Sequence, residues 1–398
     1  MSKKKVAVLF GGRSSEHEIS IITAIDAIGA IDVLKYEVIP VYISQQGRWY
    51  TGKELLQRNF YKGLPGCLES IEEVVLYPTP SIGGLVKRFP KKGLFSKPKE
   101  EIIPVDVYLP LFHGQFGEDG CIQGLFEMAD VTYCGSNVIA SAVAMNKSIC
   151  KDVLKSNGIP VLPSKVFEKR EVLRDISKVR AAVLSEPTLV NFPLFVKPCN
   201  LGSSVGIAKV SNVEELDSAI LKAVSLDTHV LIEPFLPNMF EINISVLDTE
   251  NGPKASVVEV PSKTGEALSY EDKYLRGGGK KKTAQASQGM ASLVRAIDPE
   301  SLSDTYKKTV TELALKSYQV LGCSGVARFD FMVDTAKDKI YFNELNPLPG
   351  SISFYLWEKS KPPVFYTELV TEIIEQGIRN KEVKDSLKRE FGFKALFG

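Results

Sequence analysis

Three features are scarce or missing in this 398-residue sequence: a charge bias, a long apolar run and cysteines at motif spacing. The 49 basic and 48 acidic residues give a formal charge of +1, so no global field favours nucleic acid or an anionic membrane. The six cysteines show no CxxC spacing, which indicates neither a zinc site nor a disulfide framework. The apolar run 6–10 is too short for a signal peptide or a membrane span, so we expect a cytoplasmic protein.

The composition that is present is typical of a folded globular chain, with 44% hydrophobic and 24% charged residues. The length predicts two or three domains. We expect an N-terminal α/β domain over 1–135, with an insertion of short strands and turns near 47–99, a central unit over 136–237 and a C-terminal unit over 238–398. The Gly- and Lys-rich stretch 261–290 is long enough to predict a lid or active-site loop.

Hydrophobic periodicity predicts the main elements. An apolar run, two glycines and renewed apolar periodicity indicate a strand, a turn and a helix at the start of the chain. Further helices are expected over 136–154, 213–224, 303–320 and 364–377. Further strands are expected over 36–43, 105–109, 194–197, 230–233, 241–247, 255–260, 327–333 and 340–344.

A glycine- and serine-rich loop follows the strand that ends at Lys197. Its backbone N–H groups and the hydroxyls of Ser203 and Ser204 could bind phosphate oxygens, with Lys197 as a point charge. The β-branched Val205 and Ile207 favour a hairpin over a P-loop. The alternative is an ordinary hairpin turn without a ligand.

Two apolar strands near residues 328 and 344 carry polar side chains. Alternation places Arg328 and Asp330 on one face, and it places Glu344 and Asn346 together on the partner strand. If the two faces coincide, Asp330, Glu344 and Asn346 offer the hard oxygen ligands that suit Mg²⁺ on nucleotide phosphates. The alternative is a surface salt bridge to Arg328.

Two loops that follow strands near the N-terminus are candidates for substrate contact. His113 opens a loop with three glycines and two acids, and glycines permit close backbone approach. His113 could instead be a structural histidine. Residues Glu16-His17-Glu18 follow the first strand and form either a plain turn or, if they face the same cleft, an ammonium-binding carboxylate.

These motifs together resemble a known family. Residues 10–20, the loop 113–124, Met145-Asn146-Lys147, the loop 197–206 and both acidic strands stand in the order found in the D-alanine:D-alanine ligases of the ATP-grasp superfamily. The resemblance extends from Val6 to about Gly350. It implies a mixed α/β and α+β architecture, with an ATP-grasp fold preceded by a Rossmann-like N-terminal domain.

The resemblance also implies roles for individual residues. The implied catalytic residues are Glu18, Ser203, Tyr274 and Arg328. The implied ATP-binding residues are Lys147, Lys197, Ser203, Ser204, Glu233, Phe235, Leu236, Glu241 and Lys273. The implied substrate-binding residues are Glu18, which would hold the first ammonium, His113, Arg328, Gly350, Ser351 and Ser353. Asp330, Glu344 and Asn346 would bind two Mg²⁺ ions, with Mn²⁺ as a substitute.

The implied reaction joins two D-alanine molecules through an acyl phosphate made with ATP, for peptidoglycan precursors, and a homodimer is expected. One departure concerns the segment after Gly350, where residues 351–358 replace a longer serine-containing stretch of the family. A ligase with D-serine, D-lactate or another amino acid as second substrate is therefore an open alternative. A nucleotide-binding protein without catalysis is a third reading, which the retained Arg328, Asp330, Glu344 and Asn346 disfavour.

Overall fold

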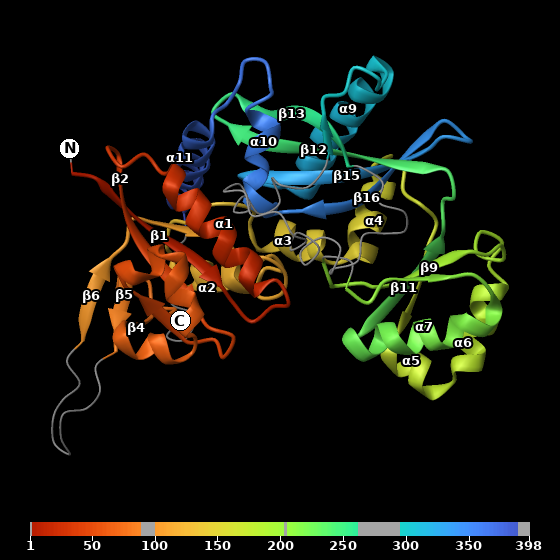
Figure 1. Ribbon diagram of the computed structural model, residues 1–398, viewed down its shortest axis with the longest axis horizontal. Coiled ribbons are helices and arrows are strands. Elements are labelled where there is room, and N and C mark those ends of the chain that lie inside the picture. The colour runs from red at the N-terminus through yellow and green to blue at the C-terminus, as the bar shows by residue number, and fades with distance from the viewer. Residues whose placement is uncertain (1, 89–99, 203–204, 262–294, 389–398) are drawn as a thin grey trace, which may run out of the picture.

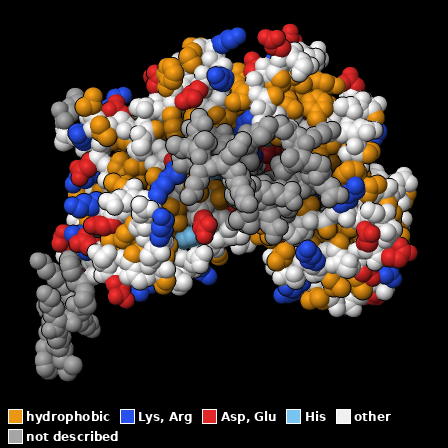
Figure 2. Space-filling model, viewed as in Figure 1, with side chains coloured by type: hydrophobic (Ala, Val, Ile, Leu, Met, Phe, Trp, Pro, Cys, Tyr) orange, Lys and Arg blue, Asp and Glu red, His pale blue; other side chains and the backbone are white. Residues whose placement is uncertain are grey.

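The computed structural model describes residues 2–88, 100–202, 205–261 and 295–388 (Figure 1). Three sheets follow one another along the chain, each with helices packed against it. Within the described residues no helix is long and apolar enough to cross a bilayer. On the face shown in Figure 2, basic and acidic side chains are interspersed, as the near-zero net charge leads one to expect.

The first sheet has seven strands in the order β6-β5-β4-β3-β2-β1-β7. Its strands are β1 (Lys4–Gly11), β2 (Tyr36–Ile43), β3 (Trp49–Thr51), β4 (Glu72–Val75), β5 (Gly84–Lys87), β6 (Glu101–Pro104) and β7 (Val107–Pro110). β2, β1 and β7 are parallel, whereas β3 to β6 continue the sheet antiparallel. The described part of the insertion thus supplies the three short strands β3 to β5 and three 3₁₀ turns, η1 (Lys53–Leu56), η2 (Arg58–Gly63) and η3 (Gly66–Ser70), as the short strands and turns expected there, and β6 follows it.

Two helices belong to this first sheet. They are α1 (His17–Ala30), which follows β1, and α2 (Cys121–Ala129), which follows β7. Because β1 and β7 are parallel neighbours, the loops at their carboxyl ends meet at one edge of the sheet, where ligands of α/β layers bind.

Two short helices, α3 (Val138–Met145) and α4 (Lys147–Ser156), stand where the sequence predicts one helix over 136–154. The single-helix prediction is wrong at Asn146, whose backbone is non-helical at φ −90° and ψ 101°. Its side-chain oxygen accepts a hydrogen bond from the Ile149 N–H at 3.0 Å and so caps α4. The break places Lys147 in the first turn of α4.

The second sheet is antiparallel, with the order β10-β9-β11-β8. Its strands are β8 (Lys165–Glu168), β9 (Leu194–Pro198), β10 (Ala208–Val210) and β11 (His229–Pro234). The helices α5 (Lys169–Arg174), α6 (Ile176–Leu184) and α7 (Val213–Leu226) pack on it around a core that includes Val196, Ile220 and Ile232.

The third sheet has the order β14-β13-β12-β15-β16 and is antiparallel throughout. Its strands are β12 (Met239–Thr249), β13 (Gly252–Pro261), β14 (Arg295–Ile297), β15 (Val326–Asp334) and β16 (Lys339–Asn346). Helix α9 (Asp304–Leu321) packs against β12 and β13. After β16 come a 3₁₀ turn η6 (Gly350–Ser353), α10 (Phe354–Trp357) and α11 (Tyr366–Asp385).

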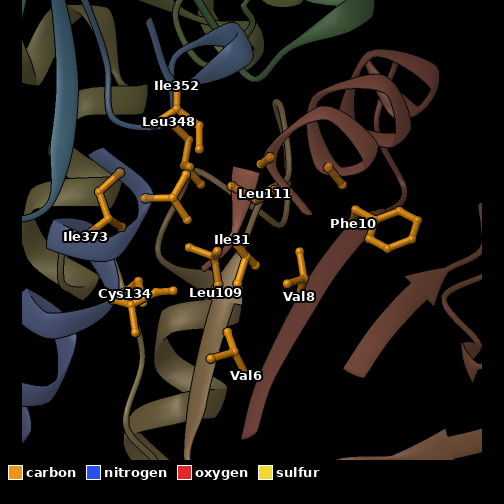
Figure 3. Close-up of a cluster of buried hydrophobic side chains, with 14 of the residues drawn as sticks. Val6, Val8, Phe10, Ile31, Leu109, Leu111, Cys134, Leu348, Ile352 and Ile373 are labelled. Carbon is orange, nitrogen blue, oxygen red and sulfur yellow. The ribbon is translucent and has the colours of Figure 1, made fainter. Parts of the chain in front are cut away.

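Helix α11 returns to the first sheet and packs against α1 and β7 (Figure 1). The sequence predicts an end at Gly377, but the helix continues to Asp385. Gly377 is needed for packing, because a Cβ there would lie 2.8 Å from the Tyr133 carbonyl oxygen. Figure 3 shows Ile373 pointing toward Leu109 and Leu348 in the shared core. This core joins the first sheet to the segment that follows β16.

Candidate active site

An open cavity lies where the first sheet, α3, the glycine loop and the β15–β16 hairpin meet. Residues far apart in the sequence line it together: Glu16, Ile19, His113, Glu118, Ala144, Met145, Lys147, Gly202, Arg328, Glu344, Leu345, Asn346, Pro347, Leu348 and Gly350. Six residues to which the sequence analysis gave a role therefore line the same cavity. They are His113, Lys147, Arg328, Glu344, Asn346 and Gly350.

Glu16 and Glu18 take opposite positions at the start of α1. Gly11 and Gly12 end β1 with φ of 89° and 94°, and the chain then turns so that Glu16 is buried at the helix N-terminus and lines the cavity. Glu18 is exposed and does not line it. The expected position of Glu18 in the cleft is thus not met, because His17 occupies the inward direction and bonds Gly12 and Tyr42. Glu16 takes the place given to Glu18.

His113 follows β7 and is buried. Its Nε2 lies 2.9 Å from the Thr23 hydroxyl of α1. Burial lowers the pKa of the His113 imidazole to about 4, although a hydrogen bond with the Leu348 backbone acts in the opposite direction. The side chain is therefore neutral near pH 7, and its ring is held at the cavity by Thr23 and the Leu348 backbone.

Glu118 is a cavity residue that was not singled out from the sequence. It accepts hydrogen bonds from the Gly114 N–H at 2.5 Å and from the Leu348 N–H at 3.2 Å. It therefore ties the loop after β7 to the segment after β16. Burial, with the nearby Glu16 carboxylate, raises the pKa of Glu118 to about 8. The acidic loop 113–120 was the available signal, but a contact 230 residues away along the chain could not be read from it.

The glycine loop connects β9 and β10, which pair antiparallel with Val196 opposite Ala208. This confirms the hairpin predicted from Val205 and Ile207. Lys147 approaches the base of the loop, because its ammonium donates to the Leu201 carbonyl at 2.7 Å and lies 3.6 Å from Glu344. Ser203 and Ser204 lie outside the described residues.

Five further residues assigned to ATP lie near the ends of β9, β11 and β12. Lys197 and Glu233 are buried and form an ion pair across the two adjacent strands. Phe235 follows β11 and packs edge-on against Phe195 at 5.2 Å. Leu236 and Glu241 are half-buried. None of these five ATP-assigned residues, Lys197, Glu233, Phe235, Leu236 and Glu241, is among the described residues that line the cavity.

The two acidic strands meet as the alternation predicts. Arg328 stands opposite Asn346, and Asp330 stands opposite Glu344. The Arg328 guanidinium donates two hydrogen bonds of 2.7 Å to the two carboxylate oxygens of Asp330, and the Asn346 amide donates to Asp330 at 3.2 Å. The pair is buried, so the alternative of a surface salt bridge is wrong. Burial raises the pKa of Asp330, while Arg328 acts in the opposite direction.

The side-chain oxygens of Asp330, Glu344 and Asn346 are of the type that binds a hard divalent cation. Asp330 and Glu344 face each other and Asn346 adds an amide oxygen, and oxygen donors are what Mg²⁺ prefers. No group of three or more His, Cys, Asp or Glu side chains able to hold a metal occurs among the described residues. Two carboxylates and an amide leave coordination positions for other oxygens, such as those of phosphate groups.

Comparison with known proteins decides the family. The family models for the D-ala D-ala ligase N-terminus and C-terminus match residues 5–136 and 153–375. The chain belongs to the D-alanine:D-alanine ligase family. A D-alanine--D-alanine ligase of Natranaerobius thermophilus is 34% identical to this chain, and the alignment covers 98% of this chain and 99% of that ligase. A D-alanine--D-alanine ligase of Caldicellulosiruptor bescii is 37% identical, and the alignment again covers 98% of this chain and 99% of that ligase.

Solved structures of the family share the fold. A D-alanine-D-alanine ligase from Coxiella burnetii is 27% identical and gives a TM-score of 0.75, with 97% of each chain covered. The VanG D-Ala:D-Ser ligase from Enterococcus faecalis is 28% identical, also with a TM-score of 0.75, and covers 94% of this chain and 100% of its own. These likenesses confirm the ATP-grasp fold.

The segment that directly follows Gly350 has an unusual backbone conformation. Ser351, Ile352 and Ser353 all have left-handed φ, at 51°, 53° and 53°. Such angles are disfavoured for any residue with a Cβ and most of all for a β-branched one. All three side chains are buried, and the Ser351 N–H lies 3.4 Å from the Thr23 hydroxyl. The Ser353 hydroxyl has no hydrogen-bond partner among the described residues.

The short helix α10 anchors this turn from its other side. The Trp357 indole N–H donates to the Ser245 hydroxyl at 3.0 Å, and the Tyr355 hydroxyl donates to Glu259 at 3.3 Å. Ser351 and Ser353 thus sit between α1 and β12 rather than on a free loop. Lys273 and Tyr274 of the expected lid lie outside the described residues.

Proposed function

We propose that this chain is an ATP-dependent ligase that joins two D-alanine molecules into D-alanyl-D-alanine for peptidoglycan precursors. The observation that carries the proposal is the single cavity that brings Glu16 and His113 together with Lys147, Arg328 and Glu344. A carboxylate suited to an ammonium group thereby faces cationic groups suited to phosphoryl oxygens. Family membership supports the same reaction. A cytoplasmic location and a homodimer are part of the proposal.

In the first step, a carboxylate oxygen of one D-alanine attacks the γ-phosphorus of ATP. The bond from that phosphorus to the β–γ bridging oxygen breaks, which releases ADP and leaves an acyl phosphate. We assign Glu16, in place of Glu18, to the ammonium of this D-alanine, with neutral His113 beside it. Lys147 and Lys197 are assigned to the phosphates, where they stabilise the charge that builds on the transferred group.

In the second step, the deprotonated amine of the second D-alanine attacks the acyl carbon, and phosphate leaves. Arg328 is assigned to the negative charge on the tetrahedral oxygen. Asp330, Glu344 and Asn346 would hold two Mg²⁺ ions, or Mn²⁺, which supply electrostatic stabilisation of phosphate oxygens when bound. Ser203, Ser204, Lys273 and Tyr274 are assigned to closure over the site, because an acyl phosphate in contact with water would hydrolyse.

Phosphate release from ATP, measured with single amino acids and with pairs, tests the function. We expect release with D-alanine alone and a dipeptide product by mass spectrometry. No release with D-alanine alone, but release with a different pair, would rule out the proposed substrate. No release with any pair would favour a nucleotide-binding protein without catalysis.

A different second substrate is the alternative, and two observations favour testing it. The left-handed turn 351–353 replaces the family's usual acceptor segment, and the D-Ala:D-Ser ligase matches this fold with the same TM-score as a D-Ala-D-Ala ligase. The assay therefore includes D-serine and D-lactate as competing acceptors at equal concentration. A mixed product dominated by D-alanyl-D-serine would establish the alternative.

A further inference from the structure

A buried lysine beside the proposed nucleotide site has no part in the mechanism above. Lys151 lies one turn after Lys147 on α4, and only 3% of its surface is exposed. Lysine is almost never fully buried unless its ammonium group is paired. Its partner is Glu233 at the end of β11, which is completely buried.

Glu233 is shared between two lysines. One carboxylate oxygen forms an ion pair with Lys151, and the other forms an ion pair with Lys197. Lys197 reaches Glu233 from the neighbouring strand β9, whereas Lys151 approaches from a helix. The three side chains form a buried group that we call the Lys–Glu–Lys triad.

The charge of the triad can be assigned. Burial would raise the pKa of Glu233, but the two lysines lower it to about 2, so this carboxylate is ionised at neutral pH. Burial lowers the pKa of the Lys151 ammonium, whereas the Glu233 carboxylate acts in the opposite direction. In the state with both ion pairs formed, two ammonium groups face one carboxylate and the triad has a net charge of +1. Burying an uncompensated charge is costly, so the arrangement calls for an anion nearby.

We infer that Lys151 is a positioning residue that engages one oxygen of Glu233 and thereby leaves the charge of Lys197 available to the phosphates of a nucleotide. Without Lys151, Glu233 and Lys197 would form a neutral pair in which the lysine is held by its carboxylate. The inference rests on the proposed function, in which Lys197 binds ATP phosphates. Lys151 contacts no substrate in this arrangement and acts only through Glu233.

Direct binding of MgATP to the full chain, with steady-state kinetics, tests this role. Lys151→Met should weaken ATP binding about tenfold, since one positive charge near the phosphates is cancelled. The KM for ATP should rise by the same factor, while kcat and the KM for D-alanine change less than about threefold. Lys155→Met, on the exposed side of the same helix, is the matched control and should bind ATP as the wild type does.

The double variant Lys151→Met/Glu233→Gln separates positioning from a merely structural role. Because Glu233 is itself among the residues assigned to ATP, the double variant is compared with Glu233→Gln alone and not with the wild type. Lys151 acts only through the Glu233 carboxylate, so Lys151→Met should weaken ATP binding less than about threefold in the Glu233→Gln background, against about tenfold in the wild type. If Lys151 has only a packing role, Lys151→Met weakens binding by the same factor in both backgrounds. That result, or unchanged binding by Lys151→Met, would overturn the inference.

Two further arms keep the test decisive. If Lys151→Met does not fold, as judged by circular dichroism, the pair Lys151→Gln and Lys151→Gln/Glu233→Gln gives the same comparison with a smaller change in shape. Lys151→Arg retains the charge and should bind ATP within about threefold of wild type. A wild-type chain that fails to bind MgATP would contradict the proposed function itself. If the wild type binds MgATP and the Lys151 variants bind it equally well, only the positioning role is contradicted.

Discussion

The β15–β16 hairpin lines the cavity, whereas the turn of Ser351, Ile352 and Ser353 is buried directly after the lining residue Gly350, and the geometry of the two regions has different origins. On the hairpin, Asp330 stands opposite Glu344 because regular strands alternate their side chains. Five residues after Asn346, the chain enters the turn of Ser351, Ile352 and Ser353, in which three consecutive φ angles are left-handed. Local rules determine the first region and contacts with distant elements determine the second.

The turn persists because surrounding packing stabilises it. Left-handed backbone at non-glycine residues costs on the order of 1–3 kcal/mol each. Ile352 is 1% exposed, and Figure 3 shows it beside Leu348, near the core shared with Leu111. Burying such a side chain contributes about 1.5–3 kcal/mol, which offsets much of its own strain. Strained backbone of this kind is concentrated at functional sites, which is a reason to test Ser351 and Ser353 as contacts of the acceptor.

The hairpin should give the largest effect on catalysis. Arg328→Ala should reduce turnover at least about a hundredfold, because it removes the cation assigned to the oxyanion. It also leaves the buried Asp330 carboxylate without its bidentate partner, which should cost about 3–5 kcal/mol in unfolding free energy. Turnover is therefore measured per folded molecule, with unfolding followed by circular dichroism. Near-normal turnover would remove Arg328 from the mechanism.

The matched control for Arg328 is a different arginine–aspartate pair. Arg180 of α6 pairs with Asp217 on the outside of the second sheet, and both side chains are partly exposed. Arg180→Ala should leave turnover unchanged and alter stability by less than about 1 kcal/mol. An equal loss in both variants would mean that the effect of Arg328→Ala is not specific to the cavity.

Two neighbouring glutamates at the start of α1 provide the next test. Glu16→Gln should raise the KM for the first D-alanine at least about tenfold, because an amide cannot neutralise the ammonium group. Glu18→Gln is the matched control and should stay within about twofold of wild type, since Glu18 is exposed. Initial rates at varied D-alanine measure both. The opposite ranking would restore the ammonium role that the sequence gives to Glu18.

The glutamate pair also shows where sequence reasoning reaches its limit. The strand, glycine turn and helix were predictable, and so was the presence of a carboxylate in that turn. Which of two carboxylates faces inward depends on the residue at which the helix begins, and His17 decides it by bonding Gly12 and Tyr42. Helix termini are the least predictable part of an element.

The same limit applies to residues whose role depends on long-range contacts. Arg328, Asp330, Glu344 and Asn346 were predictable because their spacing fits regular strands. Glu118 and Lys151 were not singled out, because their partners lie 230 and 82 residues away. The left-handed turn was not predictable either, since the residue types at Ser351, Ile352 and Ser353 do not favour positive φ.

The acceptor turn can be tested through its unpaired hydroxyl. The Ser353 hydroxyl is fully buried and has no partner in the part of the chain that the structure describes. Ser353→Ala removes an unsatisfied polar group, so the protein should become more stable by about 1 kcal/mol. If this hydroxyl is reserved for the acceptor, the KM for the second D-alanine should rise several-fold in the same variant. Thermal unfolding and initial rates measure the two effects.

Ser351→Ala is the companion variant, because both serines are candidates for the acceptor carboxylate. A rise in acceptor KM with Ser351→Ala alone would assign the role to Ser351. Lower stability of Ser353→Ala with unchanged kinetics would mean that its hydroxyl has a structural partner and that the turn is no specialised acceptor site.

The smallest expected effect concerns Glu118, which joins the two regions by accepting hydrogen bonds from Gly114 and Leu348. Its pKa rises from 4.5 in the unfolded chain to about 8 in the folded one, mainly through burial. The folded state then holds the proton more tightly, so the stability from Glu118 is complete below pH 4.5 and is lost as the pH rises through about 8. Glu118→Gln cannot ionise and should lack this decline.

The difference in Tm between Glu118→Gln and wild type isolates this effect, because Glu233 and His113 titrate alike in both proteins. Glu118→Gln should be the less stable protein at pH 5, since its amide offers a single acceptor oxygen for two backbone N–H groups. By pH 8.5 the difference should shrink or reverse by roughly a few degrees. Glu69→Gln, an exposed site, should show a constant difference. A constant difference for Glu118→Gln too would mean that Glu118 is ionised throughout and that its two hydrogen bonds outweigh its burial.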